Sequence, residues 1–89
     1  MAVQIQLTLI VRVGCHLCVA AETDLARVLG RFSAEYPEVE YHVRVTDISD
    51  QVDYQRFTDE VPVLLLNGEQ IAFWRIDEQR VFEQLKALV

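Results

Sequence analysis

The chain has 89 residues, of which 52% are hydrophobic, and its charged side chains sum to −6 at neutral pH. This length predicts a single domain, residues 1–89, with enough chain to form a core without cross-links, and the apolar content excludes a disordered protein. The acidic balance disfavours nucleic acid and anionic membrane as partners, because both select basic surfaces.

Residues 3–11 predict a strand. Their side chains alternate at first and become wholly apolar toward Val11, which is typical of a strand that is buried on both faces near its end. The residues from Met1 to Gln6 lack the basic region and the small-residue cleavage site of a secretory signal. We therefore expect a cytoplasmic protein, in which a pair of cysteines is more often catalytic than structural.

A cysteine pair follows this strand at the start of a predicted helix. Gly14 allows a tight turn into the sequence Cys15-His16-Leu17-Cys18, which contains the only two cysteines of the chain. Beyond Cys18, apolar residues recur at helical spacing until the helix must end near Pro37. These apolar residues are Ala21, Leu25, Val28, Leu29 and Phe32.

The place of Cys15 and Cys18 between a strand and a helix predicts a dithiol–disulfide redox site. Amide groups and the macrodipole at the helix N-terminus stabilise an anion, so they favour the thiolate of Cys15. A thiolate attacks disulfides, and Cys18, one turn along, can then close an intramolecular bond and release the partner. Cys15 is therefore the predicted nucleophile, with the more exposed sulfur, and Cys18 is the predicted resolving thiol.

Two structural interpretations of the pair compete with this one. Zinc normally takes four ligands, and beyond the cysteines only His16 and His42 offer conventional nitrogen ligands, one inside the motif and one far along the chain. No metal site is therefore expected within one chain. A structural disulfide across so short a loop would restrict the unfolded chain little and would stabilise the fold only weakly.

The central part of the chain predicts a second strand over residues 39–45. Four apolar side chains share one of its faces, namely Val39, Tyr41, Val43 and Val45. The segment between the first two strands is long enough for a helical crossover, so we expect these strands to be parallel.

A short helix is predicted next, over residues 50–57. Asp47 or Ser49 is its expected N-cap. Val52 and Phe57 are its expected apolar anchors.

The last third of the chain predicts a hairpin and a final helix. Val61-Pro62 opens an apolar strand over residues 63–66, and Asn67-Gly68 is the strongest hairpin signal in the sequence. The returning strand spans residues 70–74, and Asp77 caps a helix over residues 78–88. The buried side of that helix comprises Val81, Phe82, Leu85 and Leu88. The order βαβ-α-ββα predicts an α/β fold, a mixed four-stranded sheet with about three helices.

This pattern resembles the thioredoxin-fold superfamily and, within it, a group of small glutaredoxin-like proteins. The resemblance covers nearly the whole chain: a strand, the Cys15–Cys18 motif opening a helix, and Val61-Pro62 before a hairpin strand. Only fourteen residues precede Cys15, which fits the compact glutaredoxin layout, whereas thioredoxins carry a further strand and helix first. The resemblance therefore implies a single glutaredoxin-like domain.

The resemblance also implies roles for three residues outside the cysteine pair. Arg12 stands where glutaredoxins carry a Lys or Arg, and it would add positive potential near the thiolate or bind a substrate carboxylate. Pro62 would follow a cis peptide bond beside the cysteines, and the backbone of Val61 would then pair with an extended substrate. The alternatives are a solvated arginine at a strand end and an ordinary trans proline at the start of a strand.

The residues around Cys15 and in the last strand add two further expectations. A protonated His16 would favour the Cys15 thiolate, but neighbouring helical residues diverge, so an exposed histidine without a role is the alternative. Adjacent strand residues face opposite sides, so one ring of Phe73 and Trp74 is expected on the core and the other near the site.

Two departures from the family bear on glutathione. The usual motif has a proline after the first cysteine and a tyrosine before the second, where this chain has His16 and Leu17. Glutaredoxins also carry a Gly-Gly pair that lets glutathione approach closely, and Ala72-Phe73 stands near that place. Side chains there obstruct such an approach, so we expect glutathione to be a weak co-substrate, and we expect no other cofactor.

These observations predict a thiol–disulfide oxidoreductase that uses the Cys15/Cys18 couple on protein or low-molecular-weight disulfides. A thiol reductant or a reductase would regenerate the pair, and the protein is expected to act as a monomer without nucleic-acid or membrane partners. One alternative is an iron–sulfur cluster or metal carrier, in which Cys15 thiolates of two chains share a cluster. Another is a non-catalytic binding module with an inert disulfide.

Overall fold

Four strands form one mixed sheet in this computed structural model, which describes residues 4–89. The strands are β1 (Gln6–Val11), β2 (His42–Asp47), β3 (Val63–Leu66) and β4 (Glu69–Phe73), and they are ordered β2-β1-β3-β4. β1 and β2 are parallel, and β3 is antiparallel to both β1 and β4. The predicted sheet is confirmed; Val3, where the prediction began the first strand, lies outside the described residues.

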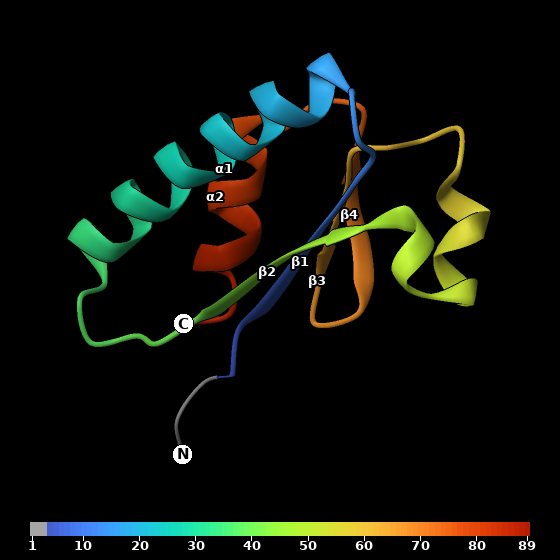
Figure 1. Cartoon of the computed structure of the whole chain (residues 1–89). Coiled ribbons are helices and arrows are strands. Elements are labelled where there is room, and N and C mark those ends of the chain that lie inside the picture. Colours follow the sequence, from blue (N-terminus) through green and yellow to red (C-terminus); the bar gives the residue numbers. More distant parts are fainter. Residues whose placement is uncertain (1–3) are drawn as a thin grey trace.

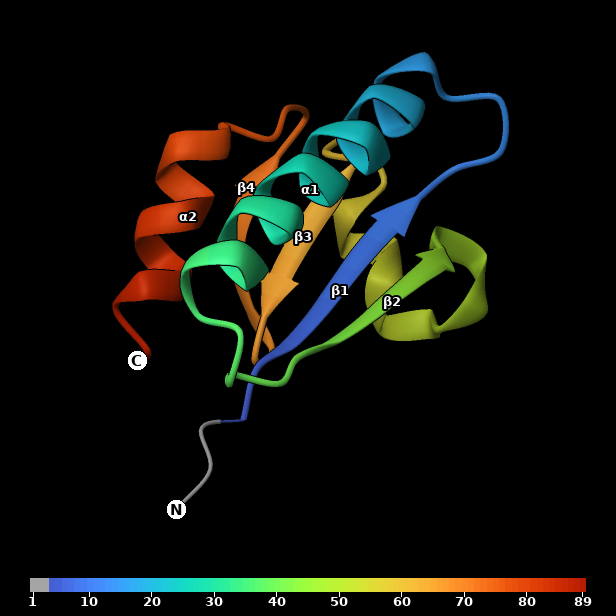
Figure 2. The same ribbon diagram turned by 90° about the vertical axis from the view of Figure 1, so that its left-hand side faces the viewer.

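Helices cover both faces of the sheet (Figures 1 and 2). α1 (His16–Glu35) and α2 (Glu78–Lys86) lie on one face, and two 3-10 helices, η1 (Ile48–Asp50) and η2 (Val52–Phe57), lie on the other. Each face has its own core cluster. The larger cluster joins α1 and α2 to β1 and β3, whereas the smaller one consists of Ile10, Ile48, Phe57, Val63 and Leu65.

The alternation of side chains in β1 explains how one strand serves both clusters. Leu7 and Leu9 belong to the cluster under the α-helices, and Ile10 belongs to the cluster under the 3-10 helices. Leu9 and Ile10 are adjacent and both fully buried, as the sequence predicted for the end of this strand. β3 divides in the same way, with Leu64 and Leu66 on one face and Val63 and Leu65 on the other.

α1 buries the whole apolar stripe that its sequence predicted. Phe32, fully buried, packs against Tyr36 and Phe82 with ring centroids 5.1 and 6.3 Å apart. The helix ends at Glu35, where the Tyr36 N–H donates to the Phe32 carbonyl, and Pro37 follows. None of the helices in residues 4–89 combines the length and the apolar character that a membrane span requires.

The prediction of one helix over residues 50–57 is wrong in type and in one anchor. Gln51 is extended, at φ −140° and ψ 138°, and separates η1 from η2. Residues three apart share a side of a 3-10 helix, which places Tyr54 beside the buried Phe57 and leaves Val52 86% exposed. Asp47 is the N-cap, as expected, since its carboxylate accepts from the Ser49 N–H at 2.9 Å.

β2 begins three residues later than predicted. Its pairing with β1 starts at His42, whose N–H donates to the Ile5 carbonyl at 2.9 Å. Val39 and Tyr41 pack partly against the larger cluster. Val43 and Val45 remain 41% and 48% exposed, because β2 is an edge strand.

The hairpin and the last helix agree with the sequence except at their ends. Asn67 and Gly68 both have positive φ, 51° and 86°, as a tight hairpin turn requires. β4 begins and ends one residue earlier than predicted. Asp77 caps α2 by accepting from the Arg80 N–H at 3.1 Å. The helix ends at Lys86, so Leu88 lies beyond it and is 36% exposed, against the prediction that it is buried.

Candidate active site

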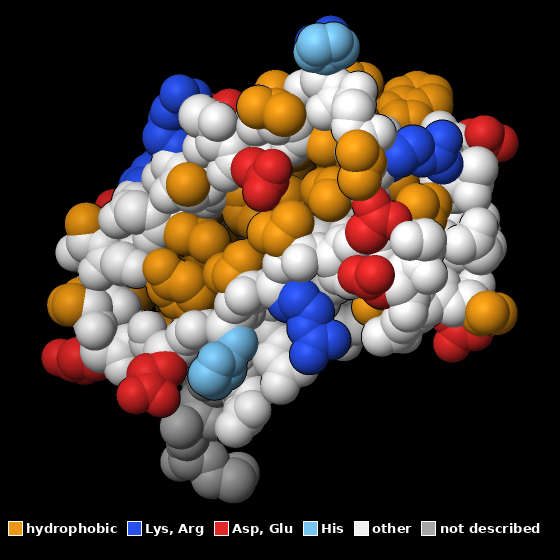
Figure 3. Space-filling view, viewed as in Figure 1, with side chains coloured by type: hydrophobic (Ala, Val, Ile, Leu, Met, Phe, Trp, Pro, Cys, Tyr) orange, Lys and Arg blue, Asp and Glu red, His pale blue; other side chains and the backbone are white. Residues whose placement is uncertain are grey.

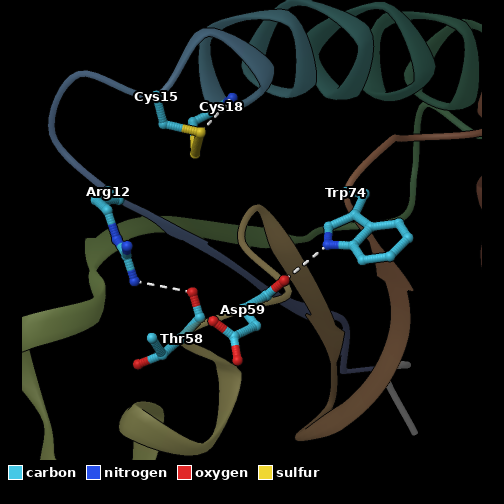
Figure 4. Close-up of a disulfide and its surroundings, with 6 residues drawn as sticks. All are labelled: Arg12, Cys15, Cys18, Thr58, Asp59 and Trp74. Carbon is cyan, nitrogen blue, oxygen red and sulfur yellow. Dashed lines mark hydrogen bonds between the residues drawn. A yellow bond between two sulfur atoms is a disulfide. The ribbon is translucent and has the colours of Figure 1, made fainter.

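Cys15 and Cys18 lie at the N-terminus of α1 and are joined by a disulfide, with their Cα atoms 5.2 Å apart (Figure 4). Cys15 is the N-cap residue of the helix, and its Sγ accepts a hydrogen bond from the Cys18 N–H at 3.1 Å. The amides of a first helical turn have no partner within the helix. A sulfur placed among them is stabilised as an anion once the pair is reduced.

The two sulfurs differ in exposure. Cys15 is partly exposed, whereas Cys18 is only 3% exposed and belongs to the buried side of α1. The predicted difference in exposure is confirmed. A molecule in solution therefore has readier access to Cys15 than to Cys18.

A backbone hydrogen bond closes the turn before the pair. The Cys15 N–H donates to the Arg12 carbonyl at 3.3 Å, and Gly14 adopts φ +79° between them. The pKa of Asp47 lies below its ordinary value, chiefly because the N–H and hydroxyl of Ser49 donate to its carboxylate. The Val13 N–H and the charge of Arg12 lower that pKa further.

Arg12 and His16 border the same hollow as the two cysteines, a space of about 230 Å³. His16 is exposed and is the first residue of α1. The guanidinium of Arg12 extends toward the facing loop, where it donates to the Thr58 carbonyl at 2.8 Å (Figure 4). The structure thus brings the predicted residues together and gives Arg12 a partner that the sequence did not suggest.

The loop that contains Thr58 faces the disulfide and is anchored by Trp74 as well as by Arg12 (Figure 4). The indole N–H of Trp74 donates to the Asp59 carbonyl at 2.9 Å. The backbone N–H of Trp74 donates to the carbonyls of Pro62, at 2.8 Å, and Glu60, at 3.2 Å. Residues 58–62, which we call the facing loop, are therefore fixed by hydrogen bonds from two distant parts of the chain.

Val61 and Pro62 end the facing loop, and the peptide bond between them is cis, as the resemblance implied. Pro62 is buried and Val61 is partly buried. Val63, the next residue, pairs with Ile10 of β1. Val61 and Pro62 therefore enter the sheet at the end where β1 leads to Arg12 and the cysteines, and their contact with a substrate stays a prediction.

The expectation that Phe73 and Trp74 face opposite sides is wrong. The two side chains are 48% and 52% exposed, and their rings meet edge to face with centroids 5.1 Å apart. The strand alternation stops because β4 ends at Phe73 and Trp74 has φ +65°. Trp74 also borders a groove of about 390 Å³ with Leu17, a second hollow beside the first turn of α1.

Metal binding by the cysteines would need ligands from elsewhere. Within residues 4–89, no three His, Cys, Asp or Glu side chains are grouped closely enough to hold a metal ion.

Comparison with known proteins assigns the family. The family model described as a glutaredoxin-like domain (DUF836) matches residues 6–86, which include the cysteine pair and the facing loop. The chain belongs to this glutaredoxin-like family. Similar relatives are uncharacterised proteins from Mycobacterium tuberculosis and Mycobacterium bovis, 28% identical over 76 residues, which is 85% of this chain and 77% of theirs.

Solved structures confirm the thioredoxin-like fold of this glutaredoxin-like protein. A Northeast Structural Genomics target protein from X. campestris has a TM-score of 0.60 and 28% identity, covering 91% of this chain and 96% of its own. A thioredoxin from Fasciola hepatica has a TM-score of 0.52 and 15% identity, covering 99% of this chain and 84% of its own. The second likeness shows the fold alone.

Proposed function

We propose that this glutaredoxin-like protein is a cytoplasmic thiol–disulfide oxidoreductase that reduces disulfides in protein substrates. The observation that carries the proposal is the Cys15–Cys18 disulfide at the N-terminus of α1. One sulfur is partly exposed and lies where helix amides stabilise a thiolate, and the other is buried one turn away.

The exchange proceeds in two displacements. The Cys15 thiolate attacks a substrate disulfide, forming a mixed disulfide and releasing one substrate thiolate, which takes a proton from water. The Cys18 thiolate then attacks the Cys15 sulfur and releases the second substrate thiolate. In total, two protein thiols become a disulfide and one substrate disulfide becomes two thiols, so an external dithiol or reductase must return two electrons for each cycle.

The surroundings of the disulfide favour a protein substrate over a small charged disulfide. The cysteine turn and the end of β4 expose large apolar side chains, namely Val13, Leu17, Phe73 and Trp74. Such a surface is suited to an apolar peptide segment beside the substrate disulfide. The partly buried Val61 would offer its backbone to that segment, as a strand edge does.

Glutathione is proposed as a weak co-substrate. Phe73 is half exposed at the place where glutaredoxins carry glycine, and a side chain there obstructs a close approach of the tripeptide. Arg12, which could bind a carboxylate, already donates to the Thr58 carbonyl. The net charge of −6 gives no general attraction for an anionic ligand.

Single cysteine variants test the exchange itself. Cys15→Ser is expected to abolish reduction of a protein disulfide, and Cys18→Ser to accumulate a mixed disulfide on Cys15 that mass spectrometry detects. Alkylation of the reduced protein at neutral pH should label Cys15 before Cys18. Turnover by Cys15→Ser, or first labelling of Cys18, would contradict the proposed roles.

A paired assay tests the reductant. The same preparation is coupled to glutathione with glutathione reductase, and to a thioredoxin reductase, with insulin as the disulfide substrate. We expect faster turnover with the thioredoxin reductase than with glutathione. An ordinary glutaredoxin is measured in the same assay. Turnover with glutathione at the level of that glutaredoxin would show that Phe73 does not obstruct the approach of glutathione.

A further inference from the structure

The outer side of β2 is an open edge of the sheet. In the part of the chain that the structure describes, residues 4–89, no strand pairs with the outer side of β2. The His42 N–H is directed inward to β1, and the backbone groups of successive strand residues point to opposite sides. The backbone N–H and C=O groups therefore point outward at Val43 and Val45, and at Tyr41 just before the strand. There they can pair with another strand.

An apolar groove of about 440 Å³ runs beside this edge, between β2 and α1 (Figure 3). Tyr41, Val43 and Val45 form its sheet side, and residues of α1 form the other wall. Gly30 belongs to that wall, and a Cβ added to it would meet nothing within 4 Å. The groove therefore has room for further apolar side chains.

Residues 39–45 are symmetric about His42 in their side-chain chemistry. Tyr41 and Val43 flank His42 and line the groove, as does Val45 two residues further along. Val39, at the matching place before Tyr41, packs partly against the larger core cluster. On the opposite side, Glu40 and Arg44 are exposed at equal distances from His42. His42 is the first residue of β2, and residues 39–41 lead into it. A segment with this pattern, when extended along its whole length, is complementary to a second copy of itself in antiparallel orientation, as a two-fold interface requires.

We propose that two copies of this chain pair through residues 39–45 in antiparallel orientation, with the two-fold axis at His42. Glu40 then lies opposite the partner's Arg44, and Tyr41 lies opposite the partner's Val43. The outward backbone groups of Tyr41 and Val43 exchange hydrogen bonds with the partner strand, while His42 occupies the position between the hydrogen-bonded pairs.

Neighbouring registers fit worse. An axis at Val43 places His42 opposite the partner's Arg44 and leaves Glu40 without a basic partner. An axis at Arg44 places two arginines opposite each other, which is destabilising. An axis between residues would turn the apolar side chains of one copy toward the polar side of the other.

The proposed pairing replaces the monomer that the sequence suggested, and it leaves the exchange chemistry untouched. β1 and β2 are parallel, so the end of β2 lies at the cysteine end of the sheet. Antiparallel pairing therefore places the two disulfides at opposite ends of the dimer, both accessible. One strand and one groove per copy make a small interface, so we expect a dimer that dissociates on dilution.

Cross-linking of single cysteines tests the register. In a Cys15→Ser/Cys18→Ser background, His42→Cys places a thiol on the axis, where the Cα atoms of a non-hydrogen-bonded pair lie about 4.5 Å apart, within disulfide reach. Arg44→Cys is the matched control, because its thiols lie well beyond that reach. Mild oxidation should cross-link the His42→Cys protein only. Equal cross-linking of both, faster cross-linking of Arg44→Cys, or none of His42→Cys would overturn the proposal.

Charge reversal with the native cysteines in place tests the pairing independently. Arg44→Glu and Glu40→Arg should each raise the dissociation constant of the dimer about tenfold or more in sedimentation equilibrium, because each places two like-charged pairs across the interface. The double variant should recover the native value, and Arg80→Glu, on α2, should leave it unchanged.

A monomer at all concentrations, or a double variant no tighter than the single ones, would overturn the pairing. Circular dichroism verifies that each variant is folded. Disulfide reduction, measured in parallel, should be the same in all of the charge-reversal variants, which keep Cys15 and Cys18, so failure of the proposed activity and failure of the proposed dimer are separate results.

Discussion

The two faces of the sheet hold the two sides of the candidate active site in different ways. The cysteines belong to α1, which is fixed by the larger core cluster together with α2. The facing loop follows η2, whose side of the sheet has a cluster of only five buried residues, and the loop is held by hydrogen bonds from Arg12 and Trp74. Cys15, the proposed nucleophile, is thus positioned by the packing of its helix, whereas the loop opposite it combines these hydrogen bonds with the burial of Pro62 and the packing of Val61 at its end.

This difference is tested first on the helical face, where the largest loss of stability is expected. Phe32→Ala should lower the free energy of unfolding by about 4–5 kcal/mol, because Phe32 is fully buried and touches both Tyr36 and Phe82. Denaturant titration measures the loss. Disulfide reduction per folded molecule should stay near the native rate, and a large decrease in that rate would show that packing on this face also sets the chemistry.

The matching change on the other face is Phe57→Ala. Phe57 is 4% exposed in the smaller cluster, whose surroundings can close around the gap more readily, so we expect a loss of about 3 kcal/mol. The rate of disulfide reduction per folded molecule should also fall, because the facing loop starts directly after Phe57. If Phe57→Ala reduces disulfides at the native rate per folded molecule, the two faces of the sheet do not differ in their effect on the site.

A smaller effect is expected from Arg12→Ala, which removes the hydrogen bond to the Thr58 carbonyl. An intramolecular hydrogen bond contributes about 1 kcal/mol, which corresponds to about fivefold in rate if it is needed to hold the loop. Arg12→Lys, which keeps the charge, is the control. Full activity of Arg12→Lys beside a slow Arg12→Ala would assign the role to charge and not to the geometry of the guanidinium.

The smallest effect concerns the Asp47 carboxylate, whose pKa is held below its ordinary value of 3.8 by Ser49. A carboxyl group with a lowered pKa in the folded state contributes stability above its ordinary pKa and loses it as the pH falls through the lowered value. The difference in melting temperature between the native protein and Asp47→Asn should therefore be largest near neutral pH and should shrink below about pH 4. A difference that does not depend on pH would contradict this.

The sequence predicted the hairpin, the helix caps and the order of exposure of the two cysteines well because their signals are local. The hairpin follows from Asn67-Gly68, both with the positive φ that the turn requires, and the caps Asp47 and Asp77 lie where their helices begin. The order of exposure of Cys15 and Cys18 follows from their place on one helix turn.

The sequence failed where distant contacts decide the structure. Val52 is exposed because the segment forms 3-10 turns over a small cluster. The packing of Ile48 and Phe57 against the sheet determines this conformation. The roles of Arg12 and Trp74 as anchors of the facing loop depend on contacts across 46 and 15 residues. No local pattern indicates such contacts, although an aromatic residue directly after a strand is a signal worth testing.

The cap on α1 links the redox state of the pair to the end of the helix. In the disulfide, the Cys15 sulfur is a neutral acceptor for the Cys18 N–H, whereas in the thiolate it is a charged acceptor, which forms a stronger hydrogen bond. Free energy gained by the reduced form at this bond makes the pair a stronger oxidant. The Cys18 amide proton is thus a built-in reporter, and it should exchange with solvent more slowly when the pair is reduced.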